Sequence, residues 1–302
     1  MTTYPIARSM SRSVKEILLK EEFVAQVLGV FEHACNLVTP DGNVVALVVP
    51  QIGDGPFNVV VDDTARLFAG VKAGTLAKLV EGQLQLGGLR IDLRGATVWE
   101  PQPDWDRLRT RLATIVSRLP LLRTLGHRHA PNNSFLALLK TPLSGDAVLS
   151  TAQKAGGALP EGWAGNQQQL QMAVVGLAGL GRGLTPAGDD FLTGLMLWAW
   201  LAHSDPDSFC RSLLDVAAPR TTALSAAFLR AATLGECSAS WHNLLTALSE
   251  GSDVEITAAV QKVLAHGATS GADTLAGFLY LPVMFPTLQF PHRPGPDTPS
   301  PR

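Results

Sequence analysis

The chain has few cysteines and no long apolar run. Its 302 residues include three cysteines that lie far apart, at Cys35, Cys210 and Cys237. Their spacing matches no paired metal-ligand motif, and three scattered thiols do not make a disulfide framework, so we expect reduced thiols in the core. No stretch reaches the roughly 18 apolar residues that a membrane span needs. We therefore expect no membrane partner.

The chain also lacks an excess of charge of either sign. Its 24 basic and 26 acidic residues give a net charge of −2, which offers no general attraction to nucleic acid or an anionic membrane. Residues 1–20 hold only short apolar runs between charged side chains, where a signal peptide would need an apolar core. We therefore predict a cytoplasmic protein that acts on a small molecule or binds other proteins.

The first third of the chain has the pattern of a β-domain, because short runs rich in Val, Leu and Ile alternate with turn residues. Residues 40–43, Pro-Asp-Gly-Asn, have turn chemistry, so we predict a hairpin between strands at 23–31 and 44–49. Gly87-Gly88 predicts a second, two-residue turn. Further strands are expected at 57–61, 84–86, 89–93 and 96–99, and a helix within 64–79.

Most of the remaining chain has helical periodicity. Apolar residues with arginines between them predict an amphipathic helix over 104–119 that covers the sheet. Residues 120–165 are rich in Gly, Pro, Asn and Ser and are expected to be mainly loop. Further helices are expected at 168–177, 189–203, 209–217, 221–233, 239–249, 254–265 and 273–281.

These patterns predict an α+β fold, with a β-rich N-terminal domain followed by a mostly α-helical C-terminal domain. The content of 46% hydrophobic and 17% charged residues is typical of globular proteins, and the length favours two domains. We expect the β-rich domain and its covering helix over 1–150, and the helical domain over 151–285. Residues 286–302 are expected to form a proline-rich tail.

Two segments of the predicted helical domain resemble one another. Residues 183–194 are Gly-Leu-Thr-Pro-Ala-Gly-Asp-Asp-Phe-Leu-Thr-Gly, and residues 267–277 are Gly-Ala-Thr-Ser-Gly-Ala-Asp-Thr-Leu-Ala-Gly. After a one-residue gap, both contain Gly-x-Thr, a small turn residue, Gly and then Asp-x-Leu-x-Gly. Packing alone would not require this pattern. We therefore predict a shared site between two helix starts.

A glycine-rich loop leads into the first of these helices. Its glycines let backbone N–H groups approach a ligand, and Arg182 adds a fixed positive charge. With Thr185 at the N-cap and Pro186 at the first helical position, the helix would present free amides to that ligand. We predict a small anionic substrate bound by Gly181, Arg182, Gly183, Thr185 and Gly188. The alternative is that the glycines only permit a tight loop against a buried helix.

Several named catalytic motifs are absent from the sequence. Gly176 to Gly181 has the Walker A spacing, but Arg182-Gly183 follows where Lys-Ser/Thr is needed. No Gly-x-Gly-x-x-Gly follows a clear strand, and no Gly-x-Ser-x-Gly is present. We therefore reject a P-loop NTPase and a dinucleotide fold, and nothing suggests a covalent hydrolase.

The candidate catalytic residues are Asp189, Asp190 and Asp273. All lie in the first turn of a predicted helix, where the helix dipole favours carboxylates even without another role. The helix after Asp190 is apolar on nearly every side, so burial would make these carboxylates costly unless they are partnered. The partner would be Arg182, Arg220, a substrate nitrogen or a hydrated Mg²⁺. Of these partners, we regard the metal ion as less favoured, and we predict no metal site.

Two further polar groups are expected to line the substrate site. The hydroxyls of Thr221 and Thr222 lie four and three residues before Ser225 and can share a helix face, although an N-cap role for either threonine is equally compatible with the sequence. The cluster 127–129, His-Arg-His, is expected to form a solvated turn outside the site. The remaining candidate substrate-binding residues are Arg220, Thr221, Thr222, Ser225, His266, Thr269, Ser270 and Gly271.

The stretch 179–194, followed by Thr221-Thr-x-x-Ser225 and by 266–277, resembles the bacterial family that includes AllH. The first motif is fairly specific, although Arg182 stands where we expect Pro in many relatives. The resemblance implies a subunit that acts with two other protein types as an oxamate carbamoyltransferase of allantoin degradation. That enzyme exchanges a carbamoyl group between carbamoyl phosphate and oxamate, with oxalurate on the other side.

Three functions remain open from the sequence. The leading hypothesis is a subunit of a carbamoyltransferase-like enzyme that binds a small anionic substrate and other subunits. The second is a Mg²⁺-dependent hydrolase, in which Asp189, Asp190 and Asp273 hold the metal as helix-start aspartates do in ADP-ribosylglycohydrolases. The third is a non-catalytic metabolite-binding subunit. The sequence identifies no cofactor.

Overall fold

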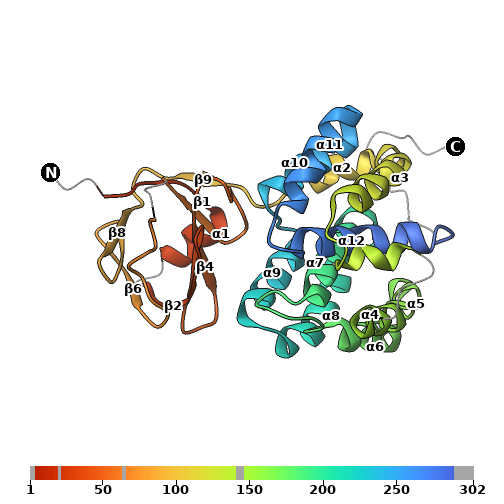
Figure 1. The fold of residues 1–302 in the computed structure, drawn as a ribbon, viewed down its shortest axis with the longest axis horizontal. Coiled ribbons are helices and arrows are strands. Elements are labelled where there is room, and N and C mark those ends of the chain that lie inside the picture. Colours follow the sequence, from red (N-terminus) through yellow and green to blue (C-terminus); the bar gives the residue numbers. More distant parts are fainter. Residues whose placement is uncertain (1–3, 20–21, 63–65, 141–145, 289–302) are drawn as a thin grey trace, which may run out of the picture. The chain divides into compact units, whose positions relative to one another are not determined.

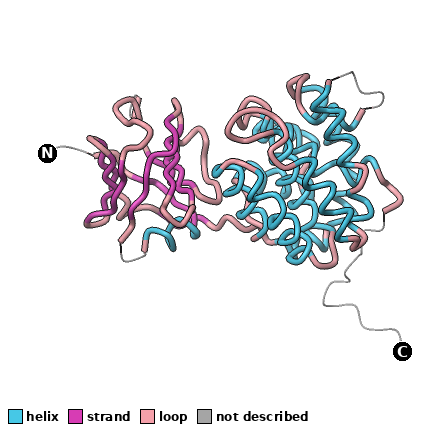
Figure 2. The backbone as a smooth tube through the Cα atoms, turned by 90° about the horizontal axis from the view of Figure 1, so that it is seen from below, coloured by secondary structure: helices cyan, strands magenta, loops and turns pink. Residues whose placement is uncertain are grey.

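The structure is a computed structural model that describes residues 4–19, 22–62, 66–140 and 146–288. It is an α+β protein, as predicted, and it divides into two compact units. The first unit comprises residues up to Pro101 together with Glu236–Ala239, and the second comprises Gln102–Gly235 and the residues from Ser240 onward. Figure 2 shows the strands in the first unit and most of the helices in the second.

The first unit is a curled sheet with one helix, α1 (Arg12–Leu18) (Figure 1). In the described residues the strand order is β8-β7-β6-β2-β3-β4-β5-β1-β9, and all neighbours are antiparallel except the parallel pairs β4–β5 and β1–β9. A parallel bridge between Ile6 and Asp92 joins the segment before β1 to β8. The strands are β1 (Ala7–Ser11), β2 (Val24–Val30), β3 (Ala34–Val38), β4 (Val44–Val48), β5 (Asn58–Val61), β6 (Leu76–Val80), β7 (Gln83–Leu86), β8 (Leu89–Asp92) and β9 (Thr97–Trp99).

All six predicted strands are present, but the sequence analysis missed three others, β1, β3 and β6. The predicted partner of β4 was the strand at 23–31, but β3 lies between them and pairs with both. The turn at 40–43 therefore joins β3 to β4. The helix expected within 64–79 is wrong, because its last residues form β6, which pairs with β2 and β7. Non-local pairing overrides the weak local pattern in both cases.

The second unit is helical and is built around α7 (Ala187–Ala202) and α12 (Ser270–Met284), which run through its middle in Figure 1. Both helices are buried on nearly every side, as their apolar sequences predict. The surrounding helices are α2 (Trp105–Thr110), α3 (Leu112–His129), α4 (Ala147–Gly156), α5 (Leu159–Trp163), α6 (Gln167–Leu177), α8 (Pro206–Ala217), α9 (Ala223–Thr233), α10 (Ala239–Glu250) and α11 (Asp253–Leu264), with short 3-10 helices η1 (Phe135–Leu139) and η2 (Ala218–Arg220).

The boundary between the units differs from the one expected near residue 150. The segment expected to cover the sheet forms α2 and α3, which pack on α7, α11 and α12 within the second unit. Much of 120–165 is also helical. The helix α3 continues through Pro120, which has no N–H to donate to the carbonyl oxygen of Val116, four residues earlier. Val116 lies near the surface, where water can supply the missing hydrogen bond. Residues 127–129 form its last turn, not the predicted solvated turn.

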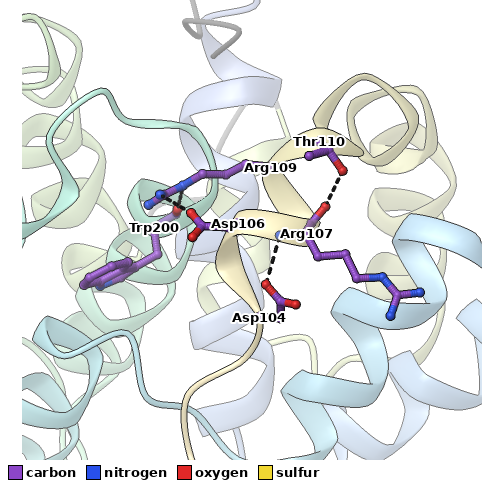
Figure 3. Close-up of polar contacts among 6 residues, drawn as sticks. All are labelled: Asp104, Asp106, Arg107, Arg109, Thr110 and Trp200. Carbon is purple, nitrogen blue, oxygen red and sulfur yellow. Dashed lines mark hydrogen bonds and ion pairs between the residues drawn. The ribbon is translucent and has the colours of Figure 1, made fainter. Parts of the chain in front are cut away.

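Helix α2 is fastened to α7 by an aromatic pair and by an arginine, Arg109, which Figure 3 shows beside Trp200. The rings of Trp105 and Trp200 stack with centroids 6.2 Å apart. The guanidinium of Arg109 lies 5.9 Å from the centre of the Trp200 ring, and its Nε donates to the Trp200 carbonyl at 2.8 Å. These contacts hold the start of the helical unit against the helix that carries the candidate site.

Candidate functional site

The two similar segments form two helix starts whose helices cross in direct backbone contact. A Cβ placed at Gly194 of α7 would overlap the carbonyl oxygen of Thr274, and one at Gly277 of α12 would overlap the carbonyl oxygen of Phe191. The two contacts are equivalent under exchange of the segments, because Gly194 and Gly277 each lie four residues after the repeated aspartate. Only glycine lets the helices approach this closely.

The repeated glycine before each aspartate also has a packing role. A Cβ at Gly188 would overlap the carbonyl oxygen of Leu177 at the end of α6, and one at Gly271 would overlap that of Val263 near the end of α11. Each segment therefore packs the start of its helix against the end of the helix before it. The repeated glycines do have a reason in packing, which corrects our expectation from the pattern.

The two helix starts meet through their hydroxyl groups. The Oγ1 of Thr185, just before α7, lies 2.9 Å from the Oγ of Ser270, the first residue of α12. Thr185 is not the N-cap that we predicted. Pro186 occupies that position with extended ψ and no side-chain cap, so Thr185 is free to reach the other segment.

Asp189 fastens the glycine-rich loop. Its side chain is buried, with 2% of the residue exposed, and both carboxylate oxygens have partners. The N–H of Gly179 donates to Oδ1 at 2.9 Å, and the hydroxyl of Thr221 donates to Oδ2. Burial raises the pKa of Asp189, and the hydrogen bonds from Thr221, Gly179 and Ser225 oppose that rise. The carboxylate itself therefore takes one of the loop amides that we expected to bind a ligand.

Asp190 is buried, and one of its carboxyl oxygens has no hydrogen-bond partner among the described residues. Only 7% of the residue is exposed, and that oxygen is Oδ2. Burial raises its pKa well above the ordinary value, the hydroxyl of Ser270 lowers it, and the charges of Asp273 and Asp189 raise it further. Asp190 is therefore the carboxyl group most strongly favoured in its protonated form.

Asp273 is the counterpart of Asp190 in the second segment, and it is fully buried. Its Oδ1 accepts the backbone N–H of Phe135 at 2.6 Å, whereas its Oδ2 has no partner among the described residues. Burial raises its pKa to about 6, against the lowering effect of Phe135 and the Thr269 hydroxyl. Both repeated aspartates thus keep one buried oxygen without a hydrogen bond.

The glycines of the loop are required by its backbone. Gly179, Gly181 and Gly183 have φ values of 71°, 124° and 95°, which other residues rarely adopt. A Cβ would lie 2.6 Å from the Arg220 carbonyl oxygen at Gly179 and 2.7 Å from the Ala187 nitrogen at Gly181, but would meet nothing within 4 Å at Gly183. The loop backbone therefore accounts for all three glycines, and Gly183 is the one that faces open space.

The third polar cluster supports the loop. The hydroxyl of Thr222 caps α9 by accepting the N–H of Ser225 at 3.1 Å, as our alternative interpretation held. The hydroxyls of Thr222 and Ser225 also donate to the carbonyl oxygen of Leu184. Together with Thr221, these residues tie the loop to the start of α9.

The expected cations do not pair with the carboxylates. Arg182 and Arg220 are exposed, and Arg220 donates to the carbonyl oxygen of Val216 at 2.6 Å. The ring of His266 lies edge-on to Phe228, with centroids 6.3 Å apart, and burial lowers the pKa of His266. In the described part of the chain, no basic side chain forms an ion pair with Asp189, Asp190 or Asp273.

Comparison with known families agrees with the resemblance carried by these segments. A family model described as oxamate carbamoyltransferase subunit AllH matches residues 177–281. A second, described as the AllH family N-terminal domain, matches residues 6–98. The chain belongs to the AllH family. The comparison with solved structures found no match. The first match spans both glycine-containing segments and the Thr221–Ser225 cluster, so the proposed site lies wholly within it.

Two further observations bear on what this AllH-family chain can bind. Across residues 4–19, 22–62, 66–140 and 146–288, no group of three or more His, Cys, Asp or Glu side chains could hold a metal ion. Within the same ranges, no helix has both the length and the apolarity to cross a bilayer.

One contact of the site had no signal in the sequence. The N–H of Phe135, which holds Asp273, comes from η1, 138 residues away along the chain. A backbone donor leaves no residue-type signature, and η1 lies in a segment that we expected to be mainly loop. A long-range backbone contact of this kind becomes visible only in the folded chain.

Proposed function

We propose that the chain is a subunit of a carbamoyltransferase-like enzyme of the oxamate and carbamoyl phosphate type, and that the paired starts of α7 and α12 hold its substrate. The family match supports the activity, because the matched family is described as a subunit of oxamate carbamoyltransferase. We further propose that the enzyme is cytoplasmic, serves allantoin or purine catabolism, and contains other subunits.

The observation that carries the choice of site is the pair of buried carboxyl oxygens without partners, Asp190 Oδ2 and Asp273 Oδ2. Buried polar atoms in folded proteins nearly always have a hydrogen bond, so two exceptions at equivalent places call for a ligand. They lie at the starts of the two helices that the family model spans.

The residues divide into two roles in this proposal. Asp189, whose oxygens are both occupied, positions the loop. In carbamoyl transfer, the oxamate nitrogen attacks the carbamoyl carbon, the bond from that carbon to the phosphate oxygen breaks, and the nitrogen loses a proton. Asp273, whose pKa is about 6, orients the attacking nitrogen and accepts that proton, while Asp190 in its acid form donates a hydrogen bond to the same end of the substrate.

The anionic end of the substrate fits the open side of the loop. Arg182 is exposed there, next to Gly183, and has no hydrogen bond or ion pair among the described residues. A guanidinium and backbone amides stabilise phosphate or carboxylate oxygens and the charge that develops on the carbonyl oxygen. This arrangement keeps the negative charge of the substrate away from the buried carboxyl groups.

The other two functions have less support. No observed arrangement favours the Mg²⁺-dependent hydrolase, since the three aspartates do not form a group that could hold a metal ion in the described chain. A non-catalytic subunit differs from our proposal in one respect: substitutions at Asp273 would leave the activity of the assembled enzyme unchanged.

The test uses the enzyme assembled with the subunits that co-purify with this chain. Phosphate release from carbamoyl phosphate in the presence of oxamate would be measured for the wild type and for Asp273→Asn. We expect the variant to lower kcat by roughly 10²- to 10⁴-fold, which is typical of losing a proton-transfer group. Asp215→Asn, an exposed position on α8, is the matched control. Full activity of Asp273→Asn would overturn the proposal.

A further inference from the structure

The hydrogen bonds of the three buried aspartates show which atoms remain for a ligand. Asp189 uses both oxygens, while Asp190 and Asp273 each keep Oδ2 without a partner. Only 7% of Asp190 is exposed, and Asp273 is fully buried. A structural carboxyl group in such surroundings would be expected to use all its oxygens. A ligand would therefore meet these two oxygens. Each accepts a hydrogen bond when its carboxyl group is ionised and can donate one when the group is protonated.

The charge around these oxygens limits what the ligand can be. The negative charges of Asp189 and Asp273 act on Asp190, and no Lys, Arg or His among the described residues forms an ion pair with these three carboxyl groups. A carboxylate or phosphate placed against Asp190 and Asp273 would be repelled by like charge. The group that fits here must offer N–H donors and carry no negative charge.

Resting on the proposed function, we propose that Asp190 and Asp273 recognise the primary amide end of the substrate and reject an isosteric methyl group. The carboxylate end then points to the open loop at Gly183. Asp273, with a pKa of about 6, is mostly ionised at neutral pH and accepts an amide N–H. Asp190, favoured in its acid form, donates O–H to the amide carbonyl oxygen.

The ligand must displace part of the loop to reach these atoms, because both oxygens are enclosed. The enclosing contacts are polar and few. The Thr185 hydroxyl meets Ser270, and the hydroxyls of Thr222 and Ser225 hold the Leu184 carbonyl. Residues 181–184 are exposed, so this is the side from which the loop can open.

Oxamate and pyruvate make the discriminating pair of ligands. Both carry a carboxylate next to a carbonyl group, and they differ in having –NH₂ or –CH₃ at the other end. Because a hydrogen bond to a charged group discriminates by about ten- to a hundredfold, we expect oxamate to bind at least about tenfold more tightly than pyruvate. Calorimetric titration of the assembled enzyme at pH 7 would measure both dissociation constants.

Asp273→Asn is the sharpest variant for this test. The Phe135 N–H needs an acceptor, so the substituted asparagine would keep its carbonyl oxygen there and turn its –NH₂ toward the ligand. Two N–H groups would then face each other. We expect the preference for oxamate over pyruvate to fall to about one, with pyruvate affinity unchanged. Asp215→Asn should keep the full preference.

The possible outcomes separate this proposal from the proposed function. Equal binding of oxamate and pyruvate by an enzyme that transfers carbamoyl groups would overturn amide recognition and leave the function standing. Equal loss of both ligands in Asp273→Asn would overturn it too, and the wild-type preference for oxamate tests the proposal even if Asp273→Asn does not fold. Tighter binding of methylammonium than of acetamide would show that the aspartates select positive charge instead. Absence of both transfer and oxamate binding would overturn the proposed function itself.

Discussion

Thr185 and Ser270 are 85 residues apart in the chain, yet their hydroxyl oxygens lie 2.9 Å from each other. Thr185 precedes α7 and Ser270 begins α12, so the contact joins the two copies of the repeated segment at their starts. The crossing of α7 and α12 at Gly194 and Gly277 places the helices so that this contact can form. A packing feature of the repeat thereby brings the two helix starts together.

The glycines at the crossing should tolerate no side chain. In Gly194→Ala or Gly277→Ala the added methyl group would overlap a backbone carbonyl oxygen of the other helix, which cannot move aside as a side chain can. Each substitution should cost about 3 kcal/mol or more of unfolding free energy, at the upper end of the range for overpacking. Urea denaturation of each variant would measure the loss.

Gly157→Ala is the control for both variants. Gly157 has φ −60° at the end of α4, and its added Cβ would come no closer than 3.4 Å to another atom. Stability should stay the same or rise slightly, because alanine lowers the entropy of the unfolded chain. If Gly194→Ala were as stable as Gly157→Ala, the close crossing would be wrong.

Asp273 should make stability depend on pH. Burial raises its pKa from 3.8 to about 6, so the folded state binds this proton more tightly than the unfolded state. The stabilisation is complete below about pH 3.8 and is lost as the pH rises through about 6. Asp273→Asn lacks this loss, which totals about 3 kcal/mol. Between pH 5 and pH 8, its stability relative to wild type should therefore rise by about 1 to 2 kcal/mol.

Denaturant unfolding at the two pH values would measure that change. Asp215→Asn removes an exposed carboxyl group from α8 and should show no such trend relative to wild type. A constant difference between Asp273→Asn and wild type across this range would mean that Asp273 does not change its protonation state between folding and unfolding.

Much of the fold could be predicted from the sequence because its strongest patterns are local. The all-round apolar pattern of 191–202 predicts a buried helix, and α7 is buried as expected. Gly87-Gly88 predicts a tight turn, and Leu86 pairs with Leu89 across it. The strand β3 was missed because the turn at 40–43 suggested an earlier partner, and only the non-local pairs of β3 with β2 and β4 reveal it.

The candidate site could be predicted only in part. The repeated sequence correctly indicated that two helix starts meet, as the Thr185–Ser270 contact shows. Its glycines suggested a ligand, although backbone packing explains Gly188 and Gly271 fully. Which oxygen of Asp190 or Asp273 remains without a partner depends on donors from distant segments, and a sequence pattern does not encode those distances.

Arg109 and Arg107 should differ in their effect on stability although they lie two residues apart on α2 (Figure 3). Arg109 donates to the Trp200 carbonyl and lies over its ring, partly buried. Arg107 pairs with Glu250 at the surface. Arg109→Ala should cost about 1 to 3 kcal/mol and Arg107→Ala less than about 1 kcal/mol, because water screens the exposed pair. Equal losses in thermal unfolding would contradict the anchoring role of Arg109.

Arg182→Ala should weaken anion binding without changing stability. Arg182 is exposed and makes no hydrogen bond or ion pair among the described residues, so its removal should leave the melting temperature unchanged. If its guanidinium holds phosphate, carbamoyl phosphate should bind the assembled enzyme about ten- to a hundredfold more weakly, since a charge-assisted contact contributes about 1.5 to 3 kcal/mol. Calorimetric titration with phosphate and carbamoyl phosphate measures this, and Arg211→Ala on the exposed face of α8 is the matched control. Identical affinities for Arg182→Ala and wild type would show that the guanidinium points away from the ligand, and would leave the loop amides as the only donors to the anion.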